Sequence, residues 1–560
     1  MGNLGEGKFQ VVVAGAGPVG MAAAIELGTR GIRTLVCETR AADHYNVARI
    51  NLTNSRSMEH FRRWGIADKL RANDPVPTEV HRDLTYSTRA NGKVILNVPN
   101  AYEWGGRLPI SSENPEWAPH PAIEKTLREK LLSLPSVTFV EHSMVKDFSQ
   151  TDNRIFVVCE DRDGPRTVAA EYLLVADGAQ SPLRKKMNLR MEGETWVQNV
   201  AWYFRAPDLA RLFEKTRLSS MTFFLNEDCY GDILLPQDNE GRWLYHLTPA
   251  PEGVDPDDWP TFRNMLYRSI GQEFEIFEPE NRYFGAQFRL APTFNFGRAI
   301  LIGDAAHLTS PFGGFGMNMG IGGAVDIGWK IAATLQGWGG SRLVDTHTLE
   351  RWDVCKYIID GALHNTKLSG AALIRPHMEE DSERGEAARA EVRDFIIREK
   401  AQQSRSLGAQ LGYRYTGSPI VISDGTELPP LEYGEYEPSS VPGCRAPHIW
   451  LGDNDSIFDH FGDGFCLLKL DQTADATALE QAAEEIGLPL KIYTLDNDEA
   501  RELYERKLIL IRPDQHVAWR GDELPADSKW LLDVVRGAAS YQDAALTDRV
   551  EGAGDEKIPA

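Results

Sequence analysis

Residues 297–307 read GRAILIGDAAH, and residues 311–318 read PFGGFGMN. The short apolar run 299–302 is rich in isoleucine and bounded by glycine, which predicts a buried strand. Asp304 follows this strand, and open α/β sheets bind ligands beyond the carboxyl ends of their strands. A carboxylate suits a polyol hydroxyl, and the glycines of 311–318 let backbone N–H groups approach a planar ring. The stretch therefore predicts one half of a nucleotide-cofactor site.

The N-terminal residues 11–20, VVVAGAGPVG, predict the other half of that site. A strand over 9–14 precedes a GxGxxG turn and an Ala-rich helix over 21–30. Gly15 permits the tight turn, Gly17 lets the backbone approach a pyrophosphate, and Gly20 allows close helix–strand packing. The pyrophosphate is expected at the helix N-terminus, where free N–H groups favour an anion. A second strand, 33–37, ends in Glu38, near the spacing of ~20 residues expected for a ribose-binding carboxylate.

Composition excludes several classes of protein. The 560 residues are 42% hydrophobic and 25% charged, as in ordinary soluble globular proteins, with room for two to four domains. The formal charge of −22 argues against nucleic acid and anionic membranes as partners. Six scattered cysteines without a CxxC pair predict no disulfide framework and no metal site. No window reaches the ~18 apolar residues of a membrane span, so we expect a cytoplasmic protein.

A third motif, YLLVADGAQSPLR at 172–184, lies between the other two and contains Asp177. With these three motifs in this order, the chain resembles the class A flavoprotein aromatic hydroxylases over nearly its whole length. It is most similar to the long phenol-hydroxylase-like members, which carry a thioredoxin-like C-terminal domain. Val175 departs from the family pattern, because relatives usually have a glycine there.

The resemblance and the chain's patterns together predict a multi-domain α/β fold. Short alternating runs indicate antiparallel sheet in two segments, and charged helices follow residue 346. The last segment reads β/β/α/β/β without a redox CxxC, which suits a thioredoxin-like packing or dimer-stabilising module, so a homodimer stays open. The expected parts are a Rossmann-like FAD-binding domain (1–74, 116–194 and 289–345), a substrate-binding β-sheet domain (75–115 and 195–288), a helical segment (346–418), a linker (419–447), a thioredoxin-like domain (448–550) and a disordered tail (551–560).

The resemblance implies that FAD is bound. The residue matching Arg49 reaches the flavin phosphates in relatives, and His120 stands where relatives commonly carry a flavin-contacting glutamine. The usual acid five residues after Asn318 is Gly323 here, and whether Asp326 replaces it is open. The implied FAD-binding residues are Gly15, Gly17, Pro18, Gly20, Glu38, Arg40, Arg49, His120, Asp177, Asp304, Pro311, Gly314, Gly316, Met317 and Asn318.

Aromatic residues are dense in 195–288, which fits a pocket for a flat organic substrate. Most of these aromatics belong to the core. Asn51 stands where relatives often carry an ionisable substrate-contacting residue; it cannot act as a base but can hydrogen-bond a phenol. The candidate substrate-binding residues are Asn51, Tyr230, Tyr245, His246 and Gln287. The sequence identifies no catalytic acid or base.

The resemblance implies an NAD(P)H-dependent monooxygenase that hydroxylates a phenolic or related aromatic compound with O2 through a flavin C4a-hydroperoxide. Because the chain has only one GxGxxG, NADPH or NADH is expected to dock transiently. Two alternatives stay open: the same flavin chemistry giving Baeyer–Villiger insertion, epoxidation or decarboxylative hydroxylation, and a non-catalytic flavoprotein scaffold. A disulfide reductase is disfavoured, since no cysteine pair follows the first strand–helix unit.

Overall fold

A six-stranded sheet carries the segments that contain the three motifs. The computed structural model describes residues 9–41, 51–76, 80–103, 105–229, 231–247, 250–400 and 403–539, except the side chains of 81, 196–198, 282–286 and 371. The strand order of the six-stranded sheet is β17-β18-β11-β1-β2-β7. Its strands are β1 (Val11–Ala14), β2 (Thr34–Cys37), β7 (Val137–Val140), β11 (Tyr172–Val175), β17 (Asn295–Phe296) and β18 (Ala299–Leu301). β1 pairs in parallel with β2 and β11, and β11 pairs in parallel with β18. Ala14, Val175 and Leu301 therefore end at one edge of the sheet.

Both faces of this sheet are covered, which explains why β1 is a continuous run of buried apolar residues. One face packs against α1 (Pro18–Thr29), α4 (His120–Leu132) and α7 (Phe315–Leu335). The other packs against α8 (Thr346–Lys367) and a three-stranded sheet. That smaller sheet contains β8 (Met144–Gln150), β9 (Ile155–Asp161) and β10 (Gly164–Ala170).

Several short elements connect the larger parts of the fold. Asn54 caps α2 by accepting a hydrogen bond from the Ser57 backbone N–H (2.9 Å), which fixes the entry of the chain into that helix. These elements are β3 (Leu52–Thr53), α2 (Ser55–Arg63), α3 (Ala67–Asn73), η1 (Ala101–Glu103), β6 (Glu116–Trp117), α5 (Pro182–Lys186), η2 (Leu209–Phe213) and η3 (Gly303–Ala305).

An eight-stranded sheet of order β19-β16-β12-β15-β14-β13-β4-β5 forms the second large unit. Its strands are β4 (His81–Ser87), β5 (Val94–Val98), β12 (Glu192–Arg205), β13 (Ser219–Phe224), β14 (Ile233–Pro236), β15 (Arg242–Leu247), β16 (Phe277–Leu290) and β19 (His307–Leu308). One face packs against α6 (Trp259–Ile270), and the other carries Met221, Ile233, Leu235 and Leu244. Side chains alternate along each strand, so the two faces have separate roles.

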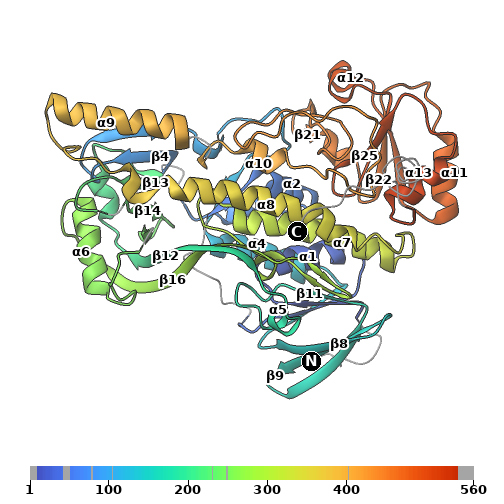
Figure 1. Cartoon of the computed structure of the whole chain (residues 1–560), viewed down its shortest axis with the longest axis horizontal. Coiled ribbons are helices and arrows are strands. Elements are labelled where there is room, and N and C mark those ends of the chain that lie inside the picture. Colours follow the sequence, from blue (N-terminus) through green and yellow to red (C-terminus); the bar gives the residue numbers. More distant parts are fainter. Residues whose placement is uncertain are drawn as a thin grey trace, which may run out of the picture.

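The chain then runs through helices to a C-terminal unit. Figure 1 shows the eight-stranded sheet and the C-terminal unit (red) at opposite ends, with α7 and α8 between them and α9 above β4. The intervening elements are η4 (Gly370–Leu373), α9 (Glu383–Phe395), a π-helix η5 (Ile396–Lys400) and α10 (Leu407–Leu411). The multi-domain α/β fold class predicted from the sequence is confirmed.

The C-terminal unit is a four-stranded sheet of order β23-β22-β24-β25, whose topology agrees with the predicted thioredoxin-like unit. The predicted strand at 449–451 is instead paired with β21 in a separate two-stranded ladder. The structure also contains α12, β25 and α13, which the sequence analysis did not predict. The elements are β20 (Trp450–Gly452), β21 (Asp455–Ser456), η7 (Ile457–His460), β22 (Phe465–Lys469), α11 (Thr477–Ile486), β23 (Leu490–Thr494), α12 (Asp498–Tyr504), β24 (Leu508–Ile511), β25 (Val517–Gly521) and α13 (Ser528–Val535). The predicted disordered tail lies outside the described residues.

The expected linker, 419–447, is packed at its two ends, while its middle, 423–439, contains no buried residue. Ile420 and Ile422 lie in the core of the C-terminal unit, and Ile422 donates a backbone hydrogen bond to Ala518 (2.9 Å). Near the other end, the buried guanidinium of Arg445 forms an ion pair with Glu59 on α2. Its prolines disfavour regular helix and strand, and burial is confined to the two ends.

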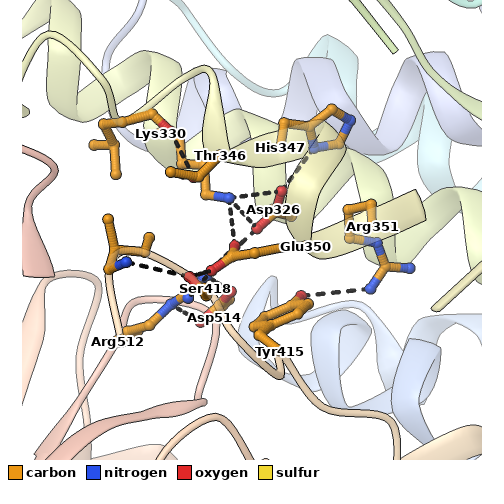
Figure 2. Close-up of polar contacts among 12 residues, drawn as sticks. Asp326, Lys330, Thr346, His347, Glu350, Arg351, Tyr415, Ser418, Arg512 and Asp514 are labelled. Atoms are coloured by element: carbon orange, nitrogen blue, oxygen red, sulfur yellow. Dashed lines mark hydrogen bonds and ion pairs between the residues drawn. The ribbon is translucent and has the colours of Figure 1, made fainter. Parts of the chain in front are cut away.

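A buried network of charges joins the C-terminal unit to α7 and α8 (Figure 2). Arg512 contacts Glu350 (2.5 Å) and Asp514 (2.8 Å), with Asp326 at 3.4 Å. Lys330 Nζ lies 2.8 Å from Asp326 and 2.5 Å from Glu350. Although burial opposes charge, Lys330, His347 and Arg512 hold the pKa of Asp326 well below its usual range. Asp326 is thus a structural ion-pair partner.

Within the described residues, no helix is both long and apolar enough to cross a bilayer. The same part of the chain contains no cluster of His, Cys, Asp or Glu that could hold a metal ion. All six cysteines are buried and unbridged.

Replacing Arg512 by Met should destabilise the fold by about 3–5 kcal/mol, because Asp326, Glu350 and Asp514 lose a buried counter-charge. Arg501→Met is the matched control: Arg501 also pairs with two carboxylates of the C-terminal unit, but these pairs are exposed. Thermal unfolding should show a large fall in Tm for the first variant and little change for the second. Equal Tm values would contradict the network's importance.

Acid should destabilise the protein in two stages. Burial lowers the pKa of several histidines, so below pH ~6.5 the unfolded chain binds more protons than the folded one and stability falls. Glu26 and Glu59 each have a pKa of about 2, so a second loss of stability begins as the pH falls below ~4.5, the value in the unfolded chain. Tm should therefore be lower at pH 5 than at pH 7.5, whereas an equal or higher Tm at pH 5 would refute this. The histidines are His60, His246, His307, His347, His448 and His516.

Candidate functional site

A cavity of about 750 Å³ lies between the carboxyl edge of the six-stranded sheet and the inner face of the eight-stranded sheet. Residues from all three sequence motifs line it. Among the residues predicted to bind cofactor or substrate, those on its wall are Gly15, Gly17, Pro18, Gly20, Glu38, Arg40, His120, Asp177, Asp304, Pro311, Gly314, Gly316, Met317, His246 and Gln287.

At one end, the turn between β1 and α1 excludes side chains. Gly15 has a φ of +101°, and a Cβ atom there would collide with the carbonyl oxygen of Ala176. A Cβ on Gly20 would collide with the carbonyl oxygen of Gly15. Gly17 faces open space, and as the N-cap of α1 it has no side chain to satisfy the first N–H groups of the helix. These N–H groups are available to a phosphate.

Glu38 follows β2 beside this turn. Its carboxylate accepts hydrogen bonds from the backbone N–H groups of Ala16 (2.8 Å) and Arg40 (2.9 Å) and from Arg40 Nε (2.9 Å). Burial alone would raise the pKa of Glu38, but the hydrogen bonds and the positive charge of Arg40 lower it to about 2. An ionised acceptor at this position suits the hydroxyls of a ribose.

His120 begins α4 on the wall of the cavity. Its Nε2 lies 3.5 Å from a carboxylate oxygen of Glu124, and its buried Nδ1 has no hydrogen-bond partner in the described part of the chain. Buried polar atoms are almost always paired in folded proteins, so this nitrogen is available to a ligand in the cavity.

Two aspartates follow the neighbouring strands β11 and β18. Asp177 Oδ2 accepts a hydrogen bond from the Leu183 backbone N–H (3.2 Å), while its buried Oδ1 has no partner among the described residues. Burial raises the pKa of Asp177, against hydrogen bonds from Ser181 and Leu183 that lower it. Asp304 lies in η3, and the loop after it turns through Gly314, with a φ of +73°, into α7. The left-handed conformation at Gly314 favours glycine.

The residues present fit FAD. The glycine turn exposes the N-terminal N–H groups of α1, which can bind a diphosphate. The ionised Glu38 lies beside this turn and can accept hydrogen bonds from a ribose. Asp304 lies further along the wall and can do the same for a polyol. Asp177 Oδ1 and His120 Nδ1 are orphaned buried atoms on the same wall.

Three of the predicted site residues that the structure describes do not line the cavity: Asn318, Asn51 and Tyr245. Asn318 accepts a hydrogen bond from the Asn54 backbone N–H (2.9 Å) and donates one to the Leu52 carbonyl (2.9 Å), so it pins α7 to β3 and α2 behind the cavity wall. Asn51 is fully buried off the wall, and its side-chain amide has no partner among the described residues. Arg49 and Tyr230 lie outside the described residues.

The placement of Tyr245 argues against the predicted substrate contact. Strand alternation sends its side chain to the α6 face of the sheet, where its hydroxyl hydrogen-bonds Asp232. Its neighbour His246 points the other way, into the cavity. Burial lowers the pKa of His246 to about 4, so its ring is neutral at pH 7.

The far end of the cavity is apolar and aromatic. Met221, Ile233, Leu235 and Leu244 form one wall. Sequence reasoning missed several further lining residues, since no local motif marks them. These are Tyr102, Trp117 and Gln403.

Comparisons with known proteins agree with this geometry. Residues 8–362 match the family described as FAD binding domain, and residues 439–539 match the aromatic-ring hydroxylase C-terminal family. The chain is 28% identical to the FAD-dependent monooxygenase apdD of Emericella nidulans, covering 97% of this chain and 92% of that protein. It is 26% identical to a phenol 2-monooxygenase of a Pseudomonas species, covering 96% and 94%.

Solved structures of two flavin-containing enzymes are similar to this chain over nearly its whole length. The rebeccamycin biosynthetic enzyme RebC with reduced flavin has a TM-score of 0.86 and 33% identity, covering 95% of this chain and 99% of that one. The ternary complex of aklavinone-11 hydroxylase with FAD and aklavinone has a TM-score of 0.80 and 26% identity, covering 95% and 100%.

Asp304→Ala should weaken FAD binding about ten- to a hundredfold, because a charged hydrogen-bond acceptor for a polyol hydroxyl is lost. FAD content after purification and fluorescence titration of the apoprotein measure this. Asp345→Ala removes an exposed carboxylate of the same domain that does not line the cavity and should bind FAD normally. Unchanged FAD affinity in the Asp304 variant would refute the assignment.

Proposed function

Because this chain belongs to the family of FAD-binding aromatic-ring hydroxylases, an FAD-dependent monooxygenase family, we propose that it hydroxylates a phenolic or related aromatic compound with NADPH or NADH and O2. One oxygen atom enters the substrate; the other leaves as water, with electrons from the reduced nicotinamide. The observation that carries the proposal is one continuous cavity with dinucleotide-binding features at one end and an apolar, aromatic wall at the other.

When bound, FAD supplies hydride acceptance and dioxygen activation. The chain's own residues bind and orient. In our proposal, the N–H groups at the start of α1 hold the diphosphate, Glu38 accepts hydrogen bonds from ribose hydroxyls, and Asp304 accepts them from the ribityl chain. Reduced nicotinamide docks transiently, since the sequence has one GxGxxG and no second.

At the substrate end, the chain excludes water and orients a phenol. Met221, Leu235 and Leu244 desolvate the ring, which protects oxygen chemistry from hydrolytic side reactions. A neutral imidazole has one nitrogen that accepts a hydrogen bond, so His246 is our candidate acceptor for a substrate hydroxyl. Sharing that proton raises the electron density of the ring carbon to be hydroxylated.

A panel of phenols tests the proposal. At least one member should stimulate NAD(P)H oxidation by the FAD-loaded protein, and the product should contain one added oxygen atom derived from isotopically labelled O2, as read by mass spectrometry. Insertion into a ring bond or loss of CO2 would indicate the alternative oxygen chemistries. No stimulation by any phenol or quinone would contradict the hydroxylase function and favour a scaffold.

A further inference from the structure

Two buried thiols lie next to each other at the dinucleotide-binding end of the cavity. Cys37 is the last residue of β2, and Cys159 belongs to β9 in the three-stranded sheet that packs against the six-stranded one. Their Sγ atoms are 3.6 Å apart, and the two residues are 2% and 3% exposed. A disulfide requires an S–S distance of ~2.05 Å, so the two sulfur atoms must approach by about 1.5 Å to form one.

The two thiols differ in access and in acidity. Cys37 lines the cavity, whereas Cys159 does not. The neighbouring Cys159 thiol is the main cause that lowers the pKa of Cys37, against burial and the charge of Asp161, which raise it. Its partnership with Cys37, and then burial, raise the pKa of Cys159. Since the thiolate is the reactive form of cysteine, Cys37 is the thiol that reacts first with a small oxidant in the cavity.

Both thiols are attached to segments that form the cavity wall. The Cys37 carbonyl accepts a hydrogen bond from the Gly15 N–H (2.8 Å) of the glycine turn, and the next residue is Glu38. On the other side, Cys159 pairs with Val145 of β8, which also lines the cavity. Joining the two sulfur atoms therefore displaces one part of this wall or the other.

We propose that Cys37 and Cys159 form a peroxide-sensitive thiol pair, and that their oxidation to a disulfide lowers the affinity of the chain for FAD. The Cys37 thiolate breaks the O–O bond of hydrogen peroxide and becomes a sulfenic acid, and the hydroxide released takes up a proton to give water. The Cys159 thiol then attacks this sulfur, so that the S–S bond forms, the S–O bond breaks and a second water leaves. One peroxide and two thiols thus give one disulfide and two waters.

The inference rests on the FAD site and not on the hydroxylase activity. Because Cys37 lies on the wall that FAD covers, bound FAD protects the pair, and the FAD-free chain is the sensitive form. Oxidation then prevents the uptake of FAD until a thiol reductant restores both cysteines.

Treatment of the apoprotein and the FAD-loaded protein with hydrogen peroxide tests this. The apoprotein should lose two thiols, and trypsin should release residues 34–40 joined to residues 155–162, with two hydrogen atoms fewer than the separate peptides. FAD should slow this reaction. The oxidised apoprotein should bind FAD about tenfold more weakly, as when one charge-assisted hydrogen bond is lost, and dithiothreitol should restore the affinity.

Three serine variants identify the thiols. Peroxide should leave the FAD affinity of Cys37→Ser unchanged, and in Cys159→Ser it should leave Cys37 as a sulfenic acid that dimedone labels. Cys355→Ser is the matched control and should respond as the wild type does, since Cys355 is buried in the same hydrophobic cluster but does not line the cavity.

Two results would overturn the inference while the FAD site and the hydroxylase function stand. One is a folded apoprotein in which peroxide never joins Cys37 to Cys159. The other is a disulfide-containing protein that binds FAD as tightly as the reduced protein. A reduced wild type that binds no FAD would overturn both the site and the inference.

Discussion

The parallel pairing of β1, β11 and β18 is the constraint on which the site depends. It brings the ends of three strands, at Ala14, Val175 and Leu301, to one edge of one sheet. The glycine turn, Asp177 and Asp304 follow these ends, so residues almost three hundred positions apart share one cavity wall. A shift of one strand by one residue would turn all of its side chains to the opposite face of the sheet, so the residues that follow it would no longer be placed correctly on the cavity wall.

The charge network of Figure 2 extends this constraint to the C-terminal unit. α7 begins at the cavity with Phe315 and carries Asp326 and Lys330 further along, where Arg512 closes the network. One helix thus connects the cavity wall to the C-terminal unit. In a unit without a redox cysteine pair, holding this helix in place is the role that the contacts support.

The cofactor side of the site could be predicted from sequence because its chemistry is local. Gly15, Gly20 and Asp304 lie in short motifs whose spacing encodes a turn or a strand end. Asn318 lies in the same stretch as Asp304, but its side chain binds the chain behind the cavity wall. A motif does not say which side of a helix faces the ligand. Strand alternation similarly places Tyr245 and His246 on opposite faces of the sheet. The sequence alone does not tell which of the two faces the cavity.

The substrate side could not be predicted, because it is assembled from distant residues. Tyr102 and Gln403 come from unrelated segments without a motif, and only the fold joins them. Lys400 belongs to the stretch after residue 346 for which the sequence predicts charged helices, yet it is buried. The packed linker is a similar case: proline content indicated irregular backbone correctly but gave no sign that Arg445 would be buried against Glu59.

The most direct measurement of the central claim, that three distant strand ends form one flavin site, is a fluorescence titration of purified, folded apoprotein with FAD. The account predicts saturable binding of a single equivalent per chain, with the yellow absorbance of bound flavin retained after gel filtration. A folded protein that stays colourless and takes up no FAD would contradict it.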